Sequence, residues 1–255
     1  MEISTRARKR RGNSRYYLFF FVSLLGVAAL GIGTWYTLTN LSIISVNKIT
    51  LEGNVAVPDS LIRQATAKYM GLNILSVPSS QVRADLKRFS RIKDVKVRKK
   101  LMHTLHLEIT ERKGVIYIKS FEGDLFPIDA EGVLLAKYTL LSTEDMPILS
   151  TYFSNNQLKA GRKLKKPYIT RVLNLHKRIL KEAPEFVPHI SEYYMIDNTI
   201  NIVDAKYGTR IIPSEEDLAS QLKRYLFVQD NGNIDRRSLV DLRFKNQVVV
   251  KAGNK

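Results

Sequence analysis

The stretch YYLFFFVSLLGVAALGIGTWYTL, from Tyr16 to Leu38, decides how the rest of the chain is arranged. It holds no charged residue over 23 positions. A helix of about 20 apolar residues crosses the hydrocarbon core of a bilayer, which is about 30 Å thick. Aromatic side chains at its two ends, Tyr17 and Trp35 among them, suit the two headgroup regions. The stretch therefore predicts a single transmembrane helix.

The segment before this helix is strongly basic. Residues 1–15 hold one acid, Glu2, and six basic side chains: Arg6, Arg8, Lys9, Arg10, Arg11 and Arg15. The first charge after the helix is Lys48. An excess of Lys and Arg keeps its side of a helix in the cytoplasm, so we expect a cytoplasmic tail and an exterior remainder.

Two other interpretations of the apolar stretch stay open, a cleaved signal peptide and a buried core helix. The apolar region of a signal peptide is about 7–15 residues long, shorter than this one. Val27-Ala28-Ala29 is only a weak cleavage signal. A core helix needs apolar helices around it, and none is near in the sequence. We therefore expect an uncleaved anchor.

The composition describes a folded, basic exterior part. Hydrophobic residues make up 44% of the chain, and about 215 residues follow the anchor, enough for one or two domains. Cysteine is absent, which excludes disulfides without fixing the redox compartment. Of the net charge of +17, residues 1–15 carry +5 and the remainder +12. A basic exterior suits an anionic membrane surface, an acidic partner or nucleic acid, and the topology disfavours the last.

The first exterior unit, residues 44–113, predicts the order β-α-α-β-β. A strand ends near Leu51, and helices begin near Pro58 and Pro78. Val82, Leu86 and Phe89 share one face of the second helix. Alternating runs at 94–99 and 104–111 predict an antiparallel hairpin. Residues 83–100 hold nine Lys or Arg, which we call the basic ridge. Two interpretations stay open: the ridge contacts a partner or lipid headgroups, or it is only solvated surface.

The second unit, residues 114–255, predicts a larger, mostly-β domain with flanking helices. Strand-like runs cover 115–119, 125–128, 190–196, 199–204 and 209–212, and helices cover 168–181 and 215–228. Residues 146–149 are assigned to a connection. The final strand spans 238–251, with a break at Lys245-Asn246. The fold class is α+β.

No catalytic pattern stands out. The four histidines are His103, His106, His176 and His189. His103 and His106 are three apart at a strand turn and so point to different faces, which disfavours metal binding. Nucleophile, phosphate-loop and metalloprotease motifs are absent. We expect a binding protein with no enzymatic activity, cofactor or metal.

The chain resembles the FtsQ/DivIB cell-division proteins. The segments that carry the resemblance are Ile49-Thr50-Leu51-Glu52-Gly53-Asn54, Gly71-Leu72-Asn73-Ile74-Leu75-Ser76-Val77, Leu86, Ile92-Lys93-Asp94-Val95-Lys96-Val97, Glu111-Arg112, Ile128-Asp129-Ala130-Glu131-Gly132-Val133 and Val240-Asp241-Leu242-Arg243-Phe244. They run through nearly the whole chain in the family's order. The resemblance implies a tail (1–15), an anchor (16–38), a POTRA domain (44–113) and a C-terminal domain (114–255).

The resemblance also implies a function, a scaffold of the division machinery at the septum of the inner membrane. The expected partners are other divisome membrane proteins, including single-span coiled-coil proteins of the FtsB/FtsL kind and septal wall synthases. Arg243 and Phe244 match the family's partner-contacting positions. An ordinary strand pair, with Arg243 outward and Phe244 inward, is the alternative. A POTRA-bearing secretion or outer-membrane assembly component and an anchored cell-wall hydrolase are the rival functions.

The last strand suggests how a partner docks. Its end, Val248-Val249-Val250, is β-branched and uncharged up to Lys251. An unpaired edge of this kind templates pairing with another extended chain. We expect Arg243 to pair with a partner carboxylate and Val249→Pro to remove a backbone donor needed for docking. Packing of the edge on the helix at 215–228 is the alternative.

Overall fold

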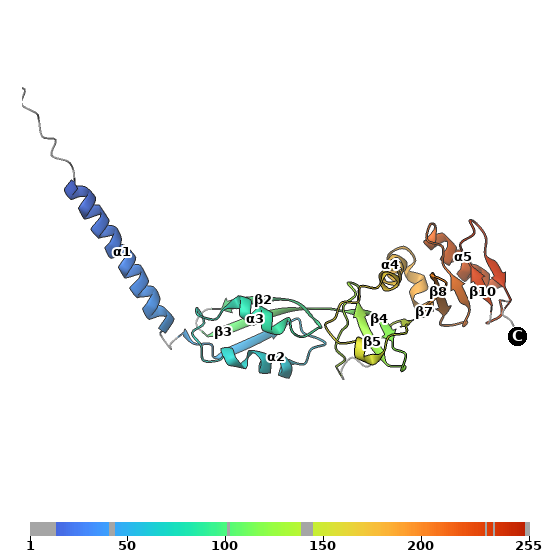
Figure 1. The fold of residues 1–255 in the computed structure, drawn as a ribbon, viewed down its shortest axis with the longest axis horizontal. Coiled ribbons are helices and arrows are strands. Elements are labelled where there is room, and N and C mark those ends of the chain that lie inside the picture. Colours follow the sequence, from blue (N-terminus) through green and yellow to red (C-terminus); the bar gives the residue numbers. More distant parts are fainter. Residues whose placement is uncertain are drawn as a thin grey trace, which may run out of the picture.

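The computed structural model describes residues 14–40, 44–100, 103–138, 145–232, 234–236 and 238–252. Its parts follow one another in chain order along the longest axis: a lone helix, a three-stranded unit and an eight-stranded unit (Figure 1). Residues 1–13 of the expected basic tail lie outside the described part of the chain.

The apolar stretch forms one helix, α1 (Ser14–Asn40). Residues Tyr16–Thr37 within it are apolar and long enough to cross a membrane, with a mean hydropathy of 2.0 and no part buried against the protein. Tyr16 and Tyr36 are 77% and 70% exposed. Because no described part of the protein covers this helix, the interpretation as a buried core helix is wrong.

The first unit after α1 has the predicted β-α-α-β-β order. Its elements are β1 (Lys48–Glu52), α2 (Asp59–Thr66) with the 3-10 turn η2 (Ala67–Tyr69), α3 (Ser79–Leu86), β2 (Ile92–Lys100) and β3 (Thr104–Glu111). The strand order is β1-β3-β2, with β1 parallel and β2 antiparallel to β3. Alternation along β3 turns Leu105 and Leu107 toward α2 and α3, where both are fully buried.

The second unit is a mixed eight-stranded sheet in the order β11-β10-β9-β8-β7-β6-β4-β5. The strands are β4 (Gly114–Lys119), β5 (Leu125–Asp129), β6 (Ile148–Ser150), β7 (Ile190–Ile196), β8 (Thr199–Asp204), β9 (Arg210–Ile212), β10 (Leu239–Asp241) and β11 (Val249–Lys251). The helices are α4 (Pro167–Glu182) and α5 (Leu218–Asn231), with 3-10 turns η4 (Asn155–Gln157) and η5 (Pro184–His189).

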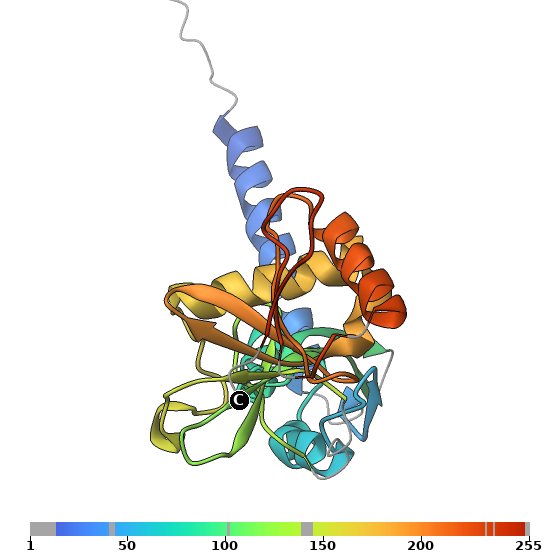
Figure 2. The same cartoon turned by 90° about the vertical axis from the view of Figure 1, so that its right-hand side faces the viewer.

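The core of this unit lies between the sheet and its two helices. Val172 and Ile179 of α4 and Leu222 of α5 are fully buried in one cluster with Ile118 and Ile202 of the sheet. Figure 2 shows α4 and α5 on one side of the strands. The α+β fold class, with a mostly-β second unit, is confirmed.

Two expectations about this sheet are wrong. Residues 146–149 were expected to form a connection, but Ile148 and Leu149 belong to β6, which lies between β4 and β7. The expected single strand at 238–251 is two short strands, β10 and β11, that pair with each other as a hairpin. Asn246, at a positive φ of 58°, lies in the turn between them. The break expected at Lys245-Asn246 is therefore a reversal of the chain.

Candidate partner-binding edge of the C-terminal sheet

Strand β11 forms one edge of the eight-stranded sheet. Among the described strands it pairs only with β10, with Asp241 opposite Val249 and Leu239 opposite Lys251. An edge strand leaves every second backbone N–H and C=O without a partner in the sheet. Val250, between the two paired positions, is 43% exposed.

The hydrogen bonds of β10 show in which direction each of its residues points. The Arg210 N–H donates to the Ser238 carbonyl (3.2 Å), and the Leu242 N–H donates to the Ile212 carbonyl (2.9 Å). Ser238 and Leu242 therefore face β9. Because successive residues of a strand point their backbone groups in opposite directions, the two residues next to them, 239 and 241, face β11.

This geometry identifies the residue of β11 that faces outward. Leu239 and Asp241 form the hydrogen-bonded pairs of the hairpin with Lys251 and Val249. The N–H and C=O of Val250 consequently point to the free edge. The Val249 N–H faces β10, so Val249→Pro removes a donor within the hairpin and not one at the free edge.

Arg243 lies just after β10 and bonds within its own chain. Its Nε lies 2.9 Å from Asp241 Oδ1 and its Nη2 lies 2.6 Å from Asp241 Oδ2. Asp241 is 1% exposed, and its hydrogen bonds from Arg243 lower the pKa of its carboxyl below the usual value. The bidentate donors that were expected to meet a partner carboxylate are therefore occupied by Asp241.

Phe244 and Val248 lie on opposite sides of the hairpin turn. Phe244 is 49% exposed and lies in the turn, outside any strand, so the inward orientation considered for it is wrong. Its carbonyl accepts from Gln221 Nε2 of α5 (3.1 Å), which fixes the turn against that helix. Val248 packs on the core cluster. Phe244 and Val250 are thus the apolar side chains that the hairpin presents to solvent.

Most basic side chains of the ridge at residues 83–100 pair with acidic groups or backbone carbonyls of the same protein. Lys87, Lys93 and Arg98 form ion pairs with Asp94, Glu131 and Glu108 at 2.8, 2.6 and 2.7 Å. Arg83 and Arg91 donate to the carbonyls of Val95 and Ala136. These five basic side chains therefore have partners within the protein, while Lys96, Lys99 and Lys100 are exposed along β2.

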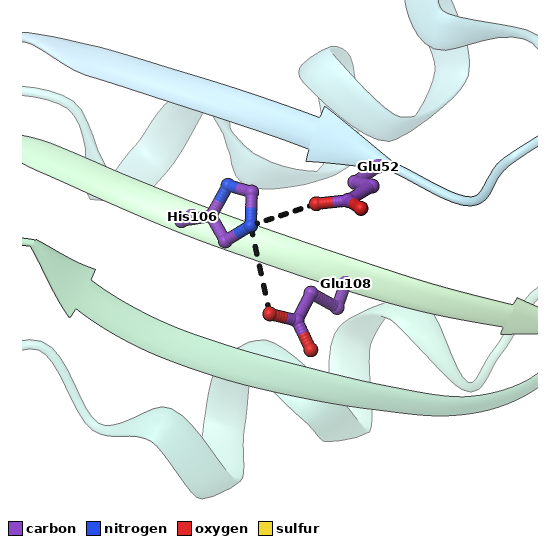
Figure 3. Close-up of side chains that lie close together, drawn as sticks. All are labelled: Glu52, His106 and Glu108. Atoms are coloured by element: carbon purple, nitrogen blue, oxygen red, sulfur yellow. Dashed lines mark ion pairs between the residues drawn. The ribbon is translucent and has the colours of Figure 1, made fainter.

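One histidine joins a cluster that the sequence did not reveal. His106 Nε2 lies 3.1 Å from Glu52 Oε2 and 3.6 Å from Glu108 Oε1, on the face of the small sheet opposite its helices (Figure 3). Thr50 Oγ1 lies 2.8 Å from His106 Nδ1. These carboxylates and the imidazole lie close enough to ligate one cation. Arg98 already pairs with Glu108, so the arrangement is satisfied by protein groups alone.

The other histidines have structural surroundings. His103 Nδ1 lies 3.2 Å from the Ser45 carbonyl, and His189 Nδ1 lies 3.3 Å from Asp204. His176 lies in the core, where its Nδ1 is 2.9 Å from the hydroxyl of Tyr193. Burial lowers the pKa of His176 to about 4, so it is neutral at physiological pH. A buried neutral histidine bonded to a buried tyrosine serves the core.

Comparison with known proteins gives the family. The FtsQ-type POTRA domain matches residues 44–112. The cell division protein DivIB of Clostridium acetobutylicum is 25% identical over 218 residues, which cover 80% of this chain and 82% of that protein. The DivIB of Clostridium botulinum strain Hall is 24% identical over 205 residues, 74% and 80% of the two chains. The FtsQ-type POTRA match and these relatives support the FtsQ/DivIB family of cell-division proteins for this chain.

The similarity extends to members named FtsQ. The cell division protein FtsQ of Streptomyces bingchenggensis is 29% identical over 116 residues, 45% of this chain and 43% of that protein. The small sheet with two helices is thus the POTRA domain, and we call the eight-stranded unit the C-terminal domain. An apolar N-terminal helix in a cell-division protein fits a single-pass membrane protein of the division site.

Proposed function

We propose that this FtsQ/DivIB protein is a non-enzymatic scaffold, anchored by α1 in the inner membrane with its tail in the cytoplasm, that recruits other divisome proteins at the septum. The observation that carries the proposal is the free edge of β11. Among the described strands β11 pairs only with β10, which leaves the outward backbone N–H and C=O of Val250 available to another strand. The proposed partners are single-span coiled-coil proteins of the FtsB/FtsL kind, together with septal wall synthases.

The proposed docking mode is addition of one more strand. A partner segment pairs its backbone with the outward N–H and C=O of Val250, which supplies affinity in the manner of β-augmentation. Phe244 and Val250 contact partner side chains and supply specificity. Arg243 acts through Asp241, because their paired groups hold the end of β10 in place next to the edge.

Localisation tests the scaffold function as a whole. A fluorescent fusion of the full chain is expected at mid-cell, and depletion of the chain is expected to disperse its FtsB-like partner from mid-cell. A chain spread evenly over the envelope, or mid-cell partners that persist after depletion, would contradict the scaffold role. The membrane topology is checked separately, since protease added outside intact cells is expected to leave an N-terminal tag undigested.

A further inference from the structure

The end of the POTRA domain nearest α1 carries three exposed apolar side chains on one loop. Met70, Leu72 and Leu75 are 44%, 46% and 43% exposed, while Ile74 of the same loop is buried in the core. The loop is hydrogen-bonded to the domain, because Gly71, at a positive φ of 76°, donates its N–H to the Val46 carbonyl (2.9 Å). The apolar side chains are therefore held outward.

This loop is bonded to the segment that arrives from the apolar helix. The Val46 N–H donates to the Leu72 carbonyl (2.8 Å), and the Ile74 N–H donates to the Ile44 carbonyl (2.9 Å). Helix α1 ends at Asn40, four residues before Ile44. Four residues span at most about 14 Å even when fully extended. Covalent geometry therefore keeps the loop close to the end of the helix, whatever the orientation of the domain.

Lysines form a row at the same end of the sheet. Lys48 of β1 lies opposite Thr104 of β3, and Thr104 lies opposite Lys100 of β2. Both lysines are exposed. Lys99, next in β2, donates from Nζ to the carbonyl of Leu75 (3.0 Å), which ties the cationic end of the basic ridge to the apolar loop.

We propose that this end of the POTRA domain, the loop Met70–Leu75 with the row of Lys48 and Lys100, is a contact surface for the anionic lipid bilayer. Apolar side chains flanked by lysines match an interface of acyl chains beneath phosphate headgroups. Because the link from α1 is short, it keeps this surface close to the bilayer, at a high effective concentration relative to the lipid headgroups. The inference rests on the proposed membrane anchoring and goes beyond partner recruitment, since the lipid contact fixes the height and tilt of the domain.

Fluorescence quenching in a purified system tests the contact. Because the natural chain contains no cysteine, Leu72→Cys introduces a single site for an environment-sensitive dye in the full chain. The labelled chain is reconstituted into vesicles of phosphatidylethanolamine and phosphatidylglycerol that contain a lipid with a nitroxide near its headgroup. Val55→Cys is the matched control, because Val55 is an exposed apolar residue, 79% exposed, beside the junction with the C-terminal domain.

The expected result is quenching of the dye at residue 72 that is several-fold stronger than at residue 55. Lys48→Gln with Lys100→Gln is expected to lower the population in contact by about fivefold for each lysine removed. Unaltered thermal melting shows that the variants fold, and Met70→Cys serves as a second reporter. Equal quenching at residues 72 and 55, or quenching that is undiminished in phosphatidylcholine vesicles, would overturn the proposal and leave the surface to a protein partner.

Flotation separates this result from the anchoring on which it rests. A full chain that floats with the vesicles and resists alkaline extraction is anchored. If it floats but residue 72 is not quenched, the lipid-contact surface is wrong and the anchor stands. If it does not float, the anchoring proposal itself fails, and the lipid-contact surface fails with it.

Discussion

At the scale of single residues, the pair of Arg243 and Asp241 shows how a side chain expected at an interface acquires a structural role. The Asp241 carboxylate is buried, and two guanidinium N–H groups of Arg243 satisfy its oxygens. If a buried carboxylate loses these donors, no hydrogen bond offsets the free energy of removing it from water, and the folded state is destabilised. The pair therefore stabilises the end of β10, next to the proposed edge.

Removal of this pair is expected to be costly to the C-terminal domain. Arg243→Ala should lower its free energy of unfolding by about 1–3 kcal/mol, as measured by denaturant titration. Arg243→Glu should cost more, because it places a second carboxylate beside Asp241. Additive losses in the cycle of Arg243→Ala, Asp241→Ala and the double variant would contradict the pairing.

The same pair predicts a pH dependence. Since the pKa of Asp241 is lowered in the folded state, its contribution is present above the unfolded value of about 3.9 and is lost as the pH falls through the lower folded value. Acid titration of the wild-type chain should show a loss of stability in this range that is smaller in Arg243→Ala. An identical acid dependence in both chains would contradict the assignment.

At the scale of elements, α3 packs on the core through the side chains that its sequence pattern predicts to be buried. Leu86 is fully buried and Phe89, just past the end of the helix, packs against the same cluster. Leu86→Ala is expected to destabilise the POTRA domain by about 2–5 kcal/mol, and Phe89→Ala by less, because Phe89 is only partly buried. Thermal melting of residues 44–113 expressed alone gives the measurement. Wild-type melting of both variants would mean that the helix face is assigned wrongly.

The sequence predicts elements well where one face is buried and poorly where context decides. Alternation along residues 104–111 predicts β3, and helical spacing at Val82 and Leu86 predicts α3, because burial imposes each period directly. Strand β6 has only three residues after a proline, too few to show any period. Its strand character comes from its two neighbours, β4 and β7, which lie far away in the sequence.

The candidate site likewise has one feature that the sequence predicts and others that depend on contacts between distant segments. The β-branched run at 248–250 indicates an edge strand from its sequence alone. The direction in which Val250 points depends on the register with β10, and that register depends on the turn at Asn246. The cluster of Glu52, His106 and Glu108 was missed because it joins two strands that are parallel neighbours but 54 residues apart along the chain. Only the Thr50–His106 register brings them together.

At the scale of the whole molecule, the POTRA domain and the C-terminal domain are joined by a polar clamp of ion pairs and hydrogen bonds. Glu131 of the C-terminal domain lies 2.6 Å from Lys93 Nζ and 2.7 Å from Arg112 Nη1 of the POTRA domain. Hydrogen bonds from these two cations lower the pKa of Glu131 to about 2. The Ala136 N–H donates to Ser90 Oγ and its carbonyl accepts from Arg91. These contacts therefore hold the POTRA domain against the C-terminal domain.

This clamp is expected to loosen in acid. The contribution of Glu131 is present above its ordinary pKa of 4.5 and is lost as the pH falls toward about 2. Glu131→Gln should reproduce the loosening at neutral pH. Spin labels at cysteines introduced at two exposed positions, one in each domain, should report a broader distance distribution in this variant. Glu185→Gln, an exposed substitution away from the junction, is the control, and equal distributions in both variants would contradict the clamp.

The most direct test of the account is capture of the FtsB-like partner by chains altered at Val250. Val250→Pro removes the outward backbone N–H, while the hydrogen bonds of Val249 and Lys251 to β10 remain. Val250→Thr is the control, because it keeps this backbone N–H and has a side chain of similar shape. With the full chain purified from cells, the account predicts that Val250→Pro loses the partner, that Val250→Thr retains it, and that both melt like the wild type. Undiminished capture by a correctly folded Val250→Pro chain would contradict docking at this edge.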